Sequence, residues 1–587
     1  MLLTQTTTPE DVKALNRAEL PQLCDEIRHA ILESSAAVGG HVAPNLGVVE
    51  LTVALHRVFN SPTDKIVFDV SHQTYAHKAL TGRAYTYIDP ERYGEASGFA
   101  NPNESEHDLF AMGHTSTSVS LGCGLAHARD LAGDTYNVIT IIGDGSLSGG
   151  LAFEGFNNAA ELDSNLIIIV NDNDQSIAEN HGGLYRNLAE LRASNGACER
   201  NVFRAMGLDY RYLDAGNDVL ALVDALQELR NIDHPIVLHV STAKGKGFEP
   251  AQSDPERWHH VGPFDMATGR KLCPGHPSEP APRTYADITG EALSTAIERD
   301  SQVVGITAAT PYIMGFTPEL RAAAGKQFVD VGIAEEHAVT FATALARSGA
   351  KPVFGVYGTF LQRAYDQLIH DTALSDLHVV FAVDRAGMVG ADGETHHGIF
   401  DATFLSEIPN MTVLCPSNFA ELRTMLDRAV NEIKGPVAIR YPRGGEGNYK
   451  ENSGRQNLVV LREGEDITLC AYGTMINNVL GAAEILHEQG IEARVVKINA
   501  ISPLYDRDMR EIIGKTRAML VAEECAGVGC MGQRMAAILG WNKISPERLE
   551  LCNLGKAFPA QGTVEELYRE FGLDAESLAK KAAEVLQ

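Results

Sequence analysis

Two short clusters of polar residues carry the first recognisable chemistry in this sequence. Gly143-Asp144-Gly145 follows an apolar run at 138–142, and Asn171-Asp172-Asn173 follows an apolar run at 166–170. Both runs are short and β-branched, which is typical of buried parallel strands. The 25 residues between the clusters suffice for a crossover helix, and a right-handed crossover brings both strand ends to one edge of a sheet. Open α/β sheets bind their ligands at that edge.

The residue types in these clusters suit a metal ion bound together with a diphosphate. Asp144 and Asn173 would offer hard oxygen atoms to Mg²⁺ or Ca²⁺, and Gly145 would let a phosphate approach the backbone. A Gly-Asp-Gly tripeptide on its own is also common in plain turns. The metal-diphosphate interpretation therefore depends on finding both clusters at matched strand ends.

Four histidines and a basic loop add to the candidate chemistry of the N-terminal half. His41, His72, His77 and His114 lie on predicted loops beside sheet elements, where imidazoles could handle phosphates and proton transfers near neutral pH. Their spacing is not that of a zinc site, and each one alone could instead cap or pack an element. The loop at 244–248, which begins with Lys244, could contact a phosphate or form a solvated turn.

The second half offers one glutamate and three arginines. Glu335 opens a predicted helix, and burial would raise the pKa of its carboxyl group; the local sequence alone favours an ordinary first-turn glutamate stabilised by the helix dipole. Arg363, Arg385 and Arg443 follow predicted strands. They are candidate phosphate ligands, with surface salt bridges as the alternative.

Strands and helices alternate along the whole chain. This rhythm predicts an α/β fold of three doubly wound, mostly parallel-sheet domains. A composition rich in Pro, Gly and His between Pro250 and Arg283 indicates an interdomain linker. We place the domains at 1–262, 284–450 and 457–587, with the linker at 263–283. The last domain shows no chemical constellation and is interpreted as a packing or dimerising domain.

Length, charge and cysteine usage restrict the class of protein. At 587 residues, with 44% hydrophobic and 21% charged residues, the chain has the composition of a soluble multidomain α/β protein. The formal net charge of −28 argues against nucleic acid and anionic membranes as partners. No secretory signal is visible, no apolar run reaches 18 residues, and nine cysteines are scattered singly. These features predict a cytoplasmic protein with reduced thiols and small-molecule substrates.

With these residues assembled, the chain resembles the thiamine diphosphate enzymes of the transketolase superfamily. Within that superfamily it is most similar to the 1-deoxy-D-xylulose-5-phosphate synthase family. The two polar clusters are similar to the superfamily's cofactor motif, and the more specific phrases lie at 46–56, 77–83, 359–367 and 384–393. The resemblance covers nearly all three domains. It implies, in order, a diphosphate-binding, a pyrimidine-binding and a C-terminal transketolase-like domain.

The resemblance also implies an activity. It implies a transketolase-type transferase that condenses pyruvate with D-glyceraldehyde 3-phosphate, releasing CO₂ and giving 1-deoxy-D-xylulose 5-phosphate, a precursor of isoprenoids, thiamine and pyridoxal. The implied cofactors are thiamine diphosphate and Mg²⁺. The family pattern is a homodimer whose site lies between the first two domains of one chain. The alternatives are a paralogue that uses another aldehyde acceptor or a ketose donor, and a non-catalytic cofactor binder.

Carried over residue by residue, the resemblance implies the following roles. Asp144, Asn173 and the main chain of Gln175 would hold the metal. The cofactor would be bound by His72, His114, Thr115, Gly145, Ser146, Asn173, Lys244, Glu335 and Phe360. The substrates would be bound by Tyr357, Arg363, Arg385, Asp392 and Arg443, and the catalytic residues would be Glu335, His41, His396 and Asp392. Glu335 would bond the aminopyrimidine nitrogen. This replaces the interpretation, favoured by the local sequence alone, of Glu335 as an ordinary first-turn glutamate.

Two segments depart from the family pattern. Only 19 residues separate Gly183 from Phe203, so a segment that is dozens of residues longer in the family is shortened here. The stretch 89–105 is also rewritten: the family normally has basic residues there, including an arginine directly before the Glu-Ser pair, where this chain has Pro102-Asn103. Smaller departures are Ser71 and Thr115, where glycine and serine are usual. The departures bear on the choice of donor and acceptor and on closure of the site, not on the cofactor chemistry.

Overall fold

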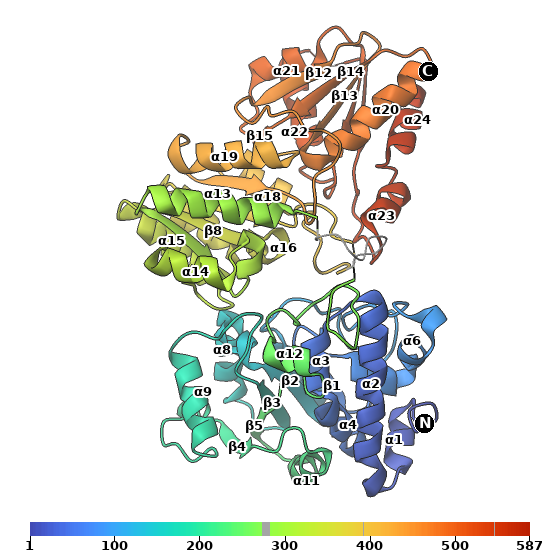
Figure 1. Cartoon of the computed structure of the whole chain (residues 1–587), viewed down its shortest axis with the longest axis vertical. Coiled ribbons are helices and arrows are strands. Elements are labelled where there is room, and N and C mark those ends of the chain that lie inside the picture. The colour runs from blue at the N-terminus through green and yellow to red at the C-terminus, as the bar shows by residue number, and fades with distance from the viewer. Residues whose placement is uncertain (273–281, 391, 545) are drawn as a thin grey trace. The chain divides into compact units, whose positions relative to one another are not determined.

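The computed structural model describes residues 1–272, 282–390, 392–544 and 546–587. The chain forms two compact units, Met1–Ala281 with Gly332–Ala334, and Pro282–Val331 with Glu335–Gln587. The first unit contains one sheet and the second contains two, all flanked by helices, and nearly all strand pairs are parallel (Figure 1). The predicted α/β fold class is therefore confirmed. None of the described helices combines the length and the apolar character needed to cross a membrane.

The first unit is built on a five-stranded parallel sheet. Its strand order is β1-β2-β3-β5-β4, with bounds β1 Lys65–Phe68, β2 Val138–Gly143, β3 Leu166–Asp172, β4 Asp209–Leu213 and β5 Pro235–Ser241. The two apolar runs expected to be strands are β2 and β3. They pair in parallel with Gly143 opposite Asn171, and helix α8 (Gly150–Ala159) makes the crossover. Both polar clusters therefore leave the sheet at the same edge.

Alternating side chains of this sheet enter two separate cores. On β3, Ile167 and Ile169 join one core, whereas Leu166, Ile168 and Val170 join the other. This period of two is what a strand buried on both faces requires. The first core is covered by α2 Leu20–Val38, α4 Val49–Val58 and α11 Val219–Leu229, and the second by α7 Ser118–Ala132, α8 and α9 Gly183–Ala193.

The second unit contains a seven-stranded and a five-stranded sheet. The first has the order β15-β10-β11-β9-β8-β6-β7 and the second β12-β14-β13-β16-β17. The bounds are β6 Val303–Thr307, β7 Phe328–Asp330, β8 Lys351–Tyr357, β9 Val380–Asp384, β10 Thr412–Leu414, β11 Val437–Arg440, β12 Leu458–Arg462, β13 Ile467–Tyr472, β14 Ala493–Ile498, β15 Ala500–Ser502, β16 Ala518–Ala522 and β17 Arg548–Cys552. Strand β15, from the C-terminal region, pairs antiparallel with β10 and so completes the sheet of the preceding region.

Helices and a buried ion pair complete the second unit. The longer helices are α13 Tyr285–Arg299, α15 Glu335–Arg347, α19 Phe419–Asn431, α20 Ile476–Glu488, α22 Met531–Trp541 and α24 Ala575–Leu586. Between the two sheets, Nζ of Lys497 on β14 lies 2.7 Å from Oε1 of Glu421 on α19, with both side chains fully buried. This pair fits the packing role expected of the C-terminal region.

The stretch interpreted as a linker is packed over its described part. Trp258 and Phe264 are buried with ring centroids 4.8 Å apart, and the N–H of Phe264 donates to the carbonyl of Ala36 at 2.9 Å. A linker would expose these rings, so the prolines and glycines here shape a folded loop of the first unit. Residues 273–281 of the expected linker lie outside the described residues, and the limits of the three predicted domains stay predictions.

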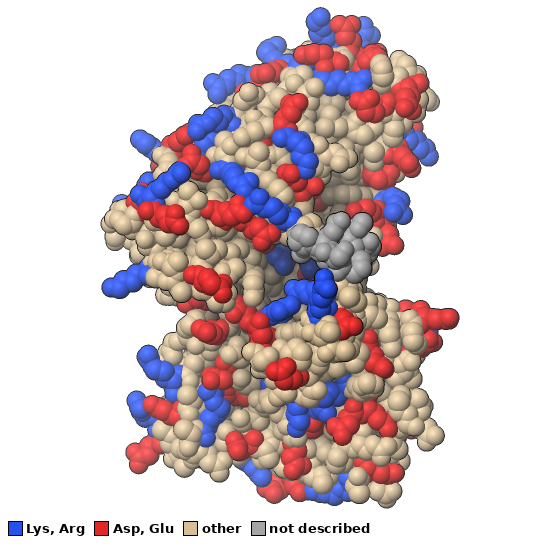
Figure 2. Space-filling view, viewed as in Figure 1, with Lys and Arg blue, Asp and Glu red and all other residues tan. Residues whose placement is uncertain are grey.

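Both signs of charge are spread over the face of each unit that Figure 2 shows. On the face shown in Figure 2, acidic and basic side chains are interspersed over both units. The formal net charge of −28 is thus not confined to one segment of that face. An anionic ligand therefore has to be held by local cationic or N–H groups, because the overall field repels it.

Candidate functional site

The turn after β2 places Asp144 in a buried position. Asp144 begins a short 3₁₀ turn, Asp144–Ser148, and is 1% exposed. Its Oδ2 accepts hydrogen bonds from the backbone N–H of Gln175 at 3.0 Å and from Nδ2 of Asn180 at 2.8 Å. A Cβ on Gly145 would lie 2.8 Å from Oγ of Ser176, so only glycine fits beneath this loop. The loops after β2 and β3 are thus packed directly together.

The side chains of Asn171 and Asn173, at the end of β3, differ in their hydrogen bonds. Oδ1 of Asn171 accepts a hydrogen bond from Oγ1 of Thr242 at 2.6 Å, so that side chain is used to join strand ends. Oδ1 of Asn173 is buried and has no hydrogen-bond partner among the described residues. Because an unpaired buried oxygen costs free energy, Asn173 rather than Asn171 has an unmet need for a ligand.

Burial makes the ionised form of Asp144 unfavourable in the protein alone. It raises the pKa of Asp144 to about 8, with a further rise from the nearby Asp172 carboxylate and an opposing effect of Lys244. Burial in turn lowers the pKa of Lys244, whose Nζ donates to the carbonyl of Ser176. A divalent cation would favour the Asp144 carboxylate, and carboxylate, amide and carbonyl oxygens are the ligands that Mg²⁺ prefers. The donor set therefore fits Mg²⁺.

A buried carboxylate at the end of β1 fixes the loop that carries His114 and Thr115. Oδ1 of Asp69 accepts from the N–H of Ser116 at 2.8 Å, and Oδ2 accepts from the N–H of Ser118 at 2.9 Å. Ser116, with a φ of 70°, donates through Oγ to the carbonyl of Ser146 at 2.7 Å. These bonds hold the loop beside the turn that contains Asp144, Gly145 and Ser146.

Four imidazoles gather in the first unit, and two of them were not predicted. The ring of His41 lies 5.1 Å from that of His72, 5.8 Å from that of His259 and 4.6 Å from that of His260. Burial, reinforced by Lys244 and the other imidazoles, holds the pKa of His259 well below 6.5, so His259 is neutral at pH 7. Sequence analysis missed this pair because Trp258-His259-His260 lies in the stretch interpreted as a linker; the adjacent histidines were the only signal.

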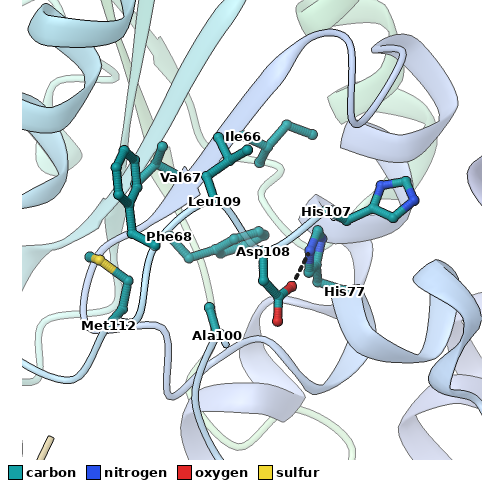
Figure 3. Close-up of a pocket in the computed structure, with 10 residues that line it drawn as sticks. Ile66, Val67, Phe68, His77, Ala100, His107, Asp108, Leu109 and Met112 are labelled. Carbon is teal, nitrogen blue, oxygen red and sulfur yellow. Dashed lines mark hydrogen bonds and ion pairs between the residues drawn. The ribbon is translucent and has the colours of Figure 1, made fainter. Parts of the chain in front are cut away.

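His77 is not part of the histidine cluster. No group of three or more His, Cys, Asp and Glu that could hold a metal is found in the part of the chain that the structure describes. His77 points instead toward Asp108, with Nε2 3.2 Å from Oδ1 (Figure 3). Its Nδ1 lies 2.9 Å from Nε2 of the fully buried His56. His77 therefore belongs to a buried structural network.

This network anchors the segment that departs from the family pattern. Glu104 pairs with Lys78 at 2.6 Å and with Arg83 at 3.1 Å. The N–H of Ala100 donates to Oγ of Ser71 at 2.8 Å, so the serine that replaces the usual glycine contacts the same segment. The ring of Phe99 then lies 5.4 Å from that of His41. The departing segment thus supplies one wall of the histidine cluster.

In the second unit Glu335 is buried at the start of α15. It is 3% exposed, whereas its neighbour Glu336 is only partly buried. Burial raises the pKa of the Glu335 carboxyl group, and Arg363, whose NH1 lies 3.5 Å from Oε2, opposes that rise. The carboxyl group can therefore retain a proton at a higher pH than an exposed glutamate does.

An aromatic and arginine cluster forms at the ends of β8 and β9. Tyr357 and Phe360 stack with centroids 4.8 Å apart, and the guanidinium of Arg385 lies 3.9 Å from the Tyr357 ring. Arg385 adopts a φ of 58°, which is unusual for a residue with a side chain, and its NH1 lies 2.8 Å from Oδ2 of Asp384. His396 meets Phe360 edge-on at 5.5 Å.

Arg443 forms an ion pair with Asp392, NH1 to Oδ2, at 2.9 Å. Both groups act on the pKa of Tyr357, which burial raises, so they lie in the field of the same cluster. The predicted residues thus fall into two groups, one in each unit. The first unit holds His41, His72, His114, Thr115, Asp144, Gly145, Ser146, Asn173, Gln175 and Lys244. The second holds Glu335, Tyr357, Phe360, Arg363, Arg385, Asp392, His396 and Arg443.

Three family models match successive parts of the chain. Residues 3–199 match the model for 1-deoxy-D-xylulose-5-phosphate synthase, residues 281–446 the transketolase pyrimidine-binding domain, and residues 456–578 the transketolase C-terminal domain. A curated 1-deoxy-D-xylulose-5-phosphate synthase of Chlorobaculum tepidum is 42% identical over 99% of this chain and 98% of its own. One of Geobacter sulfurreducens is 41% identical, covering 98% of this chain and 96% of its own.

A solved transketolase of Pichia stipitis is 17% identical, with a TM-score of 0.46 over 96% of this chain and 97% of that one. The alignment with the Chlorobaculum tepidum protein spans 630 positions, whereas this chain has 587 residues. At least 43 of those positions are therefore gaps in this chain. Gaps of that total length are what a shortened segment would produce.

Proposed function

The chain belongs to the 1-deoxy-D-xylulose-5-phosphate synthase family, and from that premise we propose its substrates, metal and residue roles. The family is one of thiamine diphosphate-dependent, transketolase-type transferases. The proposed reaction condenses pyruvate with D-glyceraldehyde 3-phosphate, with loss of CO₂, to give 1-deoxy-D-xylulose 5-phosphate. The observation that carries the proposal is an identity of 42% over nearly the full chain, in a protein that retains Asp144, Asn173 and a buried Glu335.

The metal in this proposal is Mg²⁺, bound by Asp144, Asn173 and the main chain of Gln175. Support comes from the buried Oδ1 of Asn173, which has no partner among the described residues, and from the carboxyl group of Asp144. Burial raises the pKa of that group, and a bound cation would lower it again. Lys244 and the N–H groups of the turn beginning at Asp144 would offset the charge of the cofactor's diphosphate. His72, His114, Thr115, Gly145 and Ser146 would complete the diphosphate end.

Residues of the second unit would act on the other end of the cofactor. Thiamine diphosphate, when bound, supplies the electron sink for the reaction. Glu335 would hold a proton on its carboxyl group and share it with the aminopyrimidine, a task that its raised pKa suits. Phe360 would stack on the ring. Because one cofactor molecule carries both a diphosphate and an aminopyrimidine, turnover needs both groups of residues.

Substrate binding is assigned to the arginines and the histidines. Arg385, Arg443 and Tyr357 would bind the phosphate of the acceptor, since guanidinium groups form charge-assisted, forked hydrogen bonds with phosphate. Arg363, Asp392, His396 and His41 would position the reacting carbonyl groups. His259 joins them in this proposal, because a neutral imidazole beside His41 can donate or accept a hydrogen bond without carrying charge.

The acceptor has one competing assignment. The shortened segment and Pro102-Asn103, which stand where the resemblance implies an arginine, favour, as a second candidate, a paralogue that takes another aldehyde or a ketose donor. Incubation of the purified protein with Mg²⁺, thiamine diphosphate, pyruvate and each of several aldehydes distinguishes the two. Release of CO₂ and formation of 1-deoxy-D-xylulose 5-phosphate with glyceraldehyde 3-phosphate is the expected result. No CO₂ at any acceptor concentration would exclude the decarboxylating reaction.

A reaction without pyruvate serves as the control for a ketose donor. Product formed from a ketose phosphate and an aldehyde in that reaction would favour the paralogue. We also propose a homodimer, on the basis of the family resemblance. Light scattering of the full chain would test this, with an expected mass of twice 63.4 kDa.

A further inference from the structure

Asn180 contacts the carboxylate that the proposed function assigns to the metal, although no sequence pattern assigned it a role. Its Nδ2 donates to Oδ2 of Asp144 at 2.8 Å, the same oxygen that accepts from the N–H of Gln175. Its own Oδ1 is buried and lacks a hydrogen-bond partner within the described part of the chain. Asn173 is in the same condition. Two buried amide oxygens without partners therefore lie in the loop that packs on Asp144.

The local fold explains why Asn180 reaches this position. An isolated antiparallel bridge joins Gln175 to Glu179, so the chain turns back and Asn180 comes beside Gln175. Ser176, within that turn, sits against Gly145 so closely that no Cβ would fit there. The side chain of Asn180 is therefore placed by backbone pairing and close packing, not by its own hydrogen bond alone.

The following helix contacts both the turn after β2 and the loop after β3. The hydroxyl of Tyr185 on α9 donates to the carbonyl of Gly145 at 3.2 Å. NH1 of Arg192, also on α9, lies 2.8 and 2.7 Å from the two oxygens of Asp172, and its NH2 lies 2.7 Å from Oδ1 of Asp174. These contacts bracket Asn173 on both sides. The segment after the cofactor motif thus restrains the metal loop.

We propose that Asn180 is a positioning residue of the metal site, an inference that rests on the proposed function. Its N–H orients the Asp144 carboxylate toward the ion, and its Oδ1 accepts a hydrogen bond from a water bound to Mg²⁺. Mg²⁺ keeps several of its waters when it binds to proteins, and residues that orient ligands in this way affect metal affinity by about 10- to 100-fold. A plain structural hydrogen bond would leave Oδ1 of Asn180 without a role.

The test compares four variants of the full chain at saturating thiamine diphosphate. The measured quantities are the dissociation constants of Mg²⁺ by calorimetry and of Mn²⁺ by electron paramagnetic resonance. Asn180→Ala is the test, and Asn180→Leu, closer in shape, replaces it if alanine loosens the loop. Asn187→Ala is the matched control, because the side chain of Asn187 on α9 bonds the carbonyl of Arg200 at 2.7 Å and the N–H of Val202 at 3.1 Å, and neither group belongs to the proposed metal site. Asn173→Ala tests the metal site of the proposed function itself.

The expected result is metal binding about 10-fold or more weaker in Asn180→Ala and unchanged in Asn187→Ala. The melting temperature of the metal-free protein should stay unchanged, and high Mg²⁺ should restore kcat. If Asn173→Ala weakens metal binding and both Asn180 variants do not, the inference is wrong and the proposed function stands. If Asn173→Ala also leaves metal binding unchanged, the proposed metal site is wrong, and the role of Asn180 falls with it.

Discussion

In the first unit, NH1 of Arg83 lies 2.6 Å from Oδ2 of Asp108, and NH2 lies 2.9 Å from Oδ1. This two-pronged contact is buried, and His77 and the N–H of Asn101 bond the same carboxylate. It joins the helical turns at 75–88 to the segment that departs from the family pattern. Because Phe99 in that segment contacts His41, the ion pair supports the histidine cluster at a distance.

Removal of the Asp108 charge should destabilise the first unit in a pH-dependent way. Burial alone would favour protonation, but hydrogen bonds from Arg83 and His77 hold the pKa of Asp108 well below 3.8. A lowered carboxyl pKa stabilises the fold fully above the unfolded-state value and loses that effect as the pH falls below it. Asp108→Asn should lower the free energy of unfolding by about 3 kcal/mol at pH 7, because the buried guanidinium of Arg83 loses its charged partner.

The free energies of unfolding of Asp108→Asn and of the parent protein should converge below pH 3.8. Their difference should fall by about 1.4 kcal/mol per pH unit. Unfolding midpoints measured by calorimetry at pH 7, 5 and 3 would show this. Asp134→Asn, at an exposed position, is the control and should leave the midpoint unchanged. A constant difference at all three pH values would contradict the assignment.

Asp69 should control cofactor affinity without contacting the cofactor's reacting atoms. The carboxylate of Asp69 now accepts hydrogen bonds from the N–H groups of Ser116 and Ser118. In Asp69→Asn, the side-chain NH₂ group would face one of these donors, and that hydrogen bond would be lost. Each bond to a charged acceptor is worth about 1.5–3 kcal/mol, so the loop of His114 and Thr115 should loosen. Fluorescence titration with thiamine diphosphate and Mg²⁺ should show binding weakened about 10-fold or more. An unchanged affinity would show that the loop is held by other contacts.

Glu335→Ala should abolish turnover while binding of the cofactor is only weakened. A positioned proton donor or acceptor contributes about 10²- to 10⁴-fold to the rate, and Glu335 is the buried carboxyl group proposed for that task. Steady-state CO₂ release and cofactor titration on the same preparation would separate the two effects. Glu336→Ala is the matched control, because its side chain is only partly buried. Loss of turnover in both variants to the same extent would count against a special role for Glu335.

Arg385→Ala should discriminate between phosphorylated and unphosphorylated acceptors. If Arg385 binds the phosphate, kcat/KM for glyceraldehyde 3-phosphate should fall about 10- to 100-fold, the worth of one charge-assisted bond. The value for D-glyceraldehyde should change far less. Arg455→Ala removes an exposed guanidinium paired with Glu432 and should alter neither value. Equal losses for the two aldehydes would assign Arg385 to the stacking of Tyr357 instead.

Several features of the fold and the site could be read from the sequence because their signals are local. The runs at 138–142 and 166–170 are strands, since β-branched residues buried on both faces need no partner to be recognised. Ser176 packs so closely on Gly145 that a Cβ would not fit there, whereas the predicted approach of a phosphate to Gly145 stays a prediction. Asn173 was predicted as a metal ligand; its Oδ1 is buried without a partner among the described residues, whereas Oδ1 of Asn171 accepts from Thr242, and the ligand role stays a prediction.

Other features depended on which residues the tertiary fold brings together. His259 and His260 reach His41 because the loop after the first sheet folds back against α2 and is buried, which its composition concealed. His77 lies in a different network from His41 and His72, although the sequence places all three on predicted loops beside sheet elements. The burial of Glu335 and the contact of Asn180 with Asp144 were decided in the same way.

On its own, the sequence determined the class of fold and supplied the candidate residues for a metal and a diphosphate, because periodicity and turn chemistry act over a few residues. Tertiary structure alone decided which of these side chains are buried, paired or left with an unmet hydrogen bond. The physical reason is that pKa values and hydrogen-bond satisfaction depend on neighbours from distant segments, which no local pattern encodes.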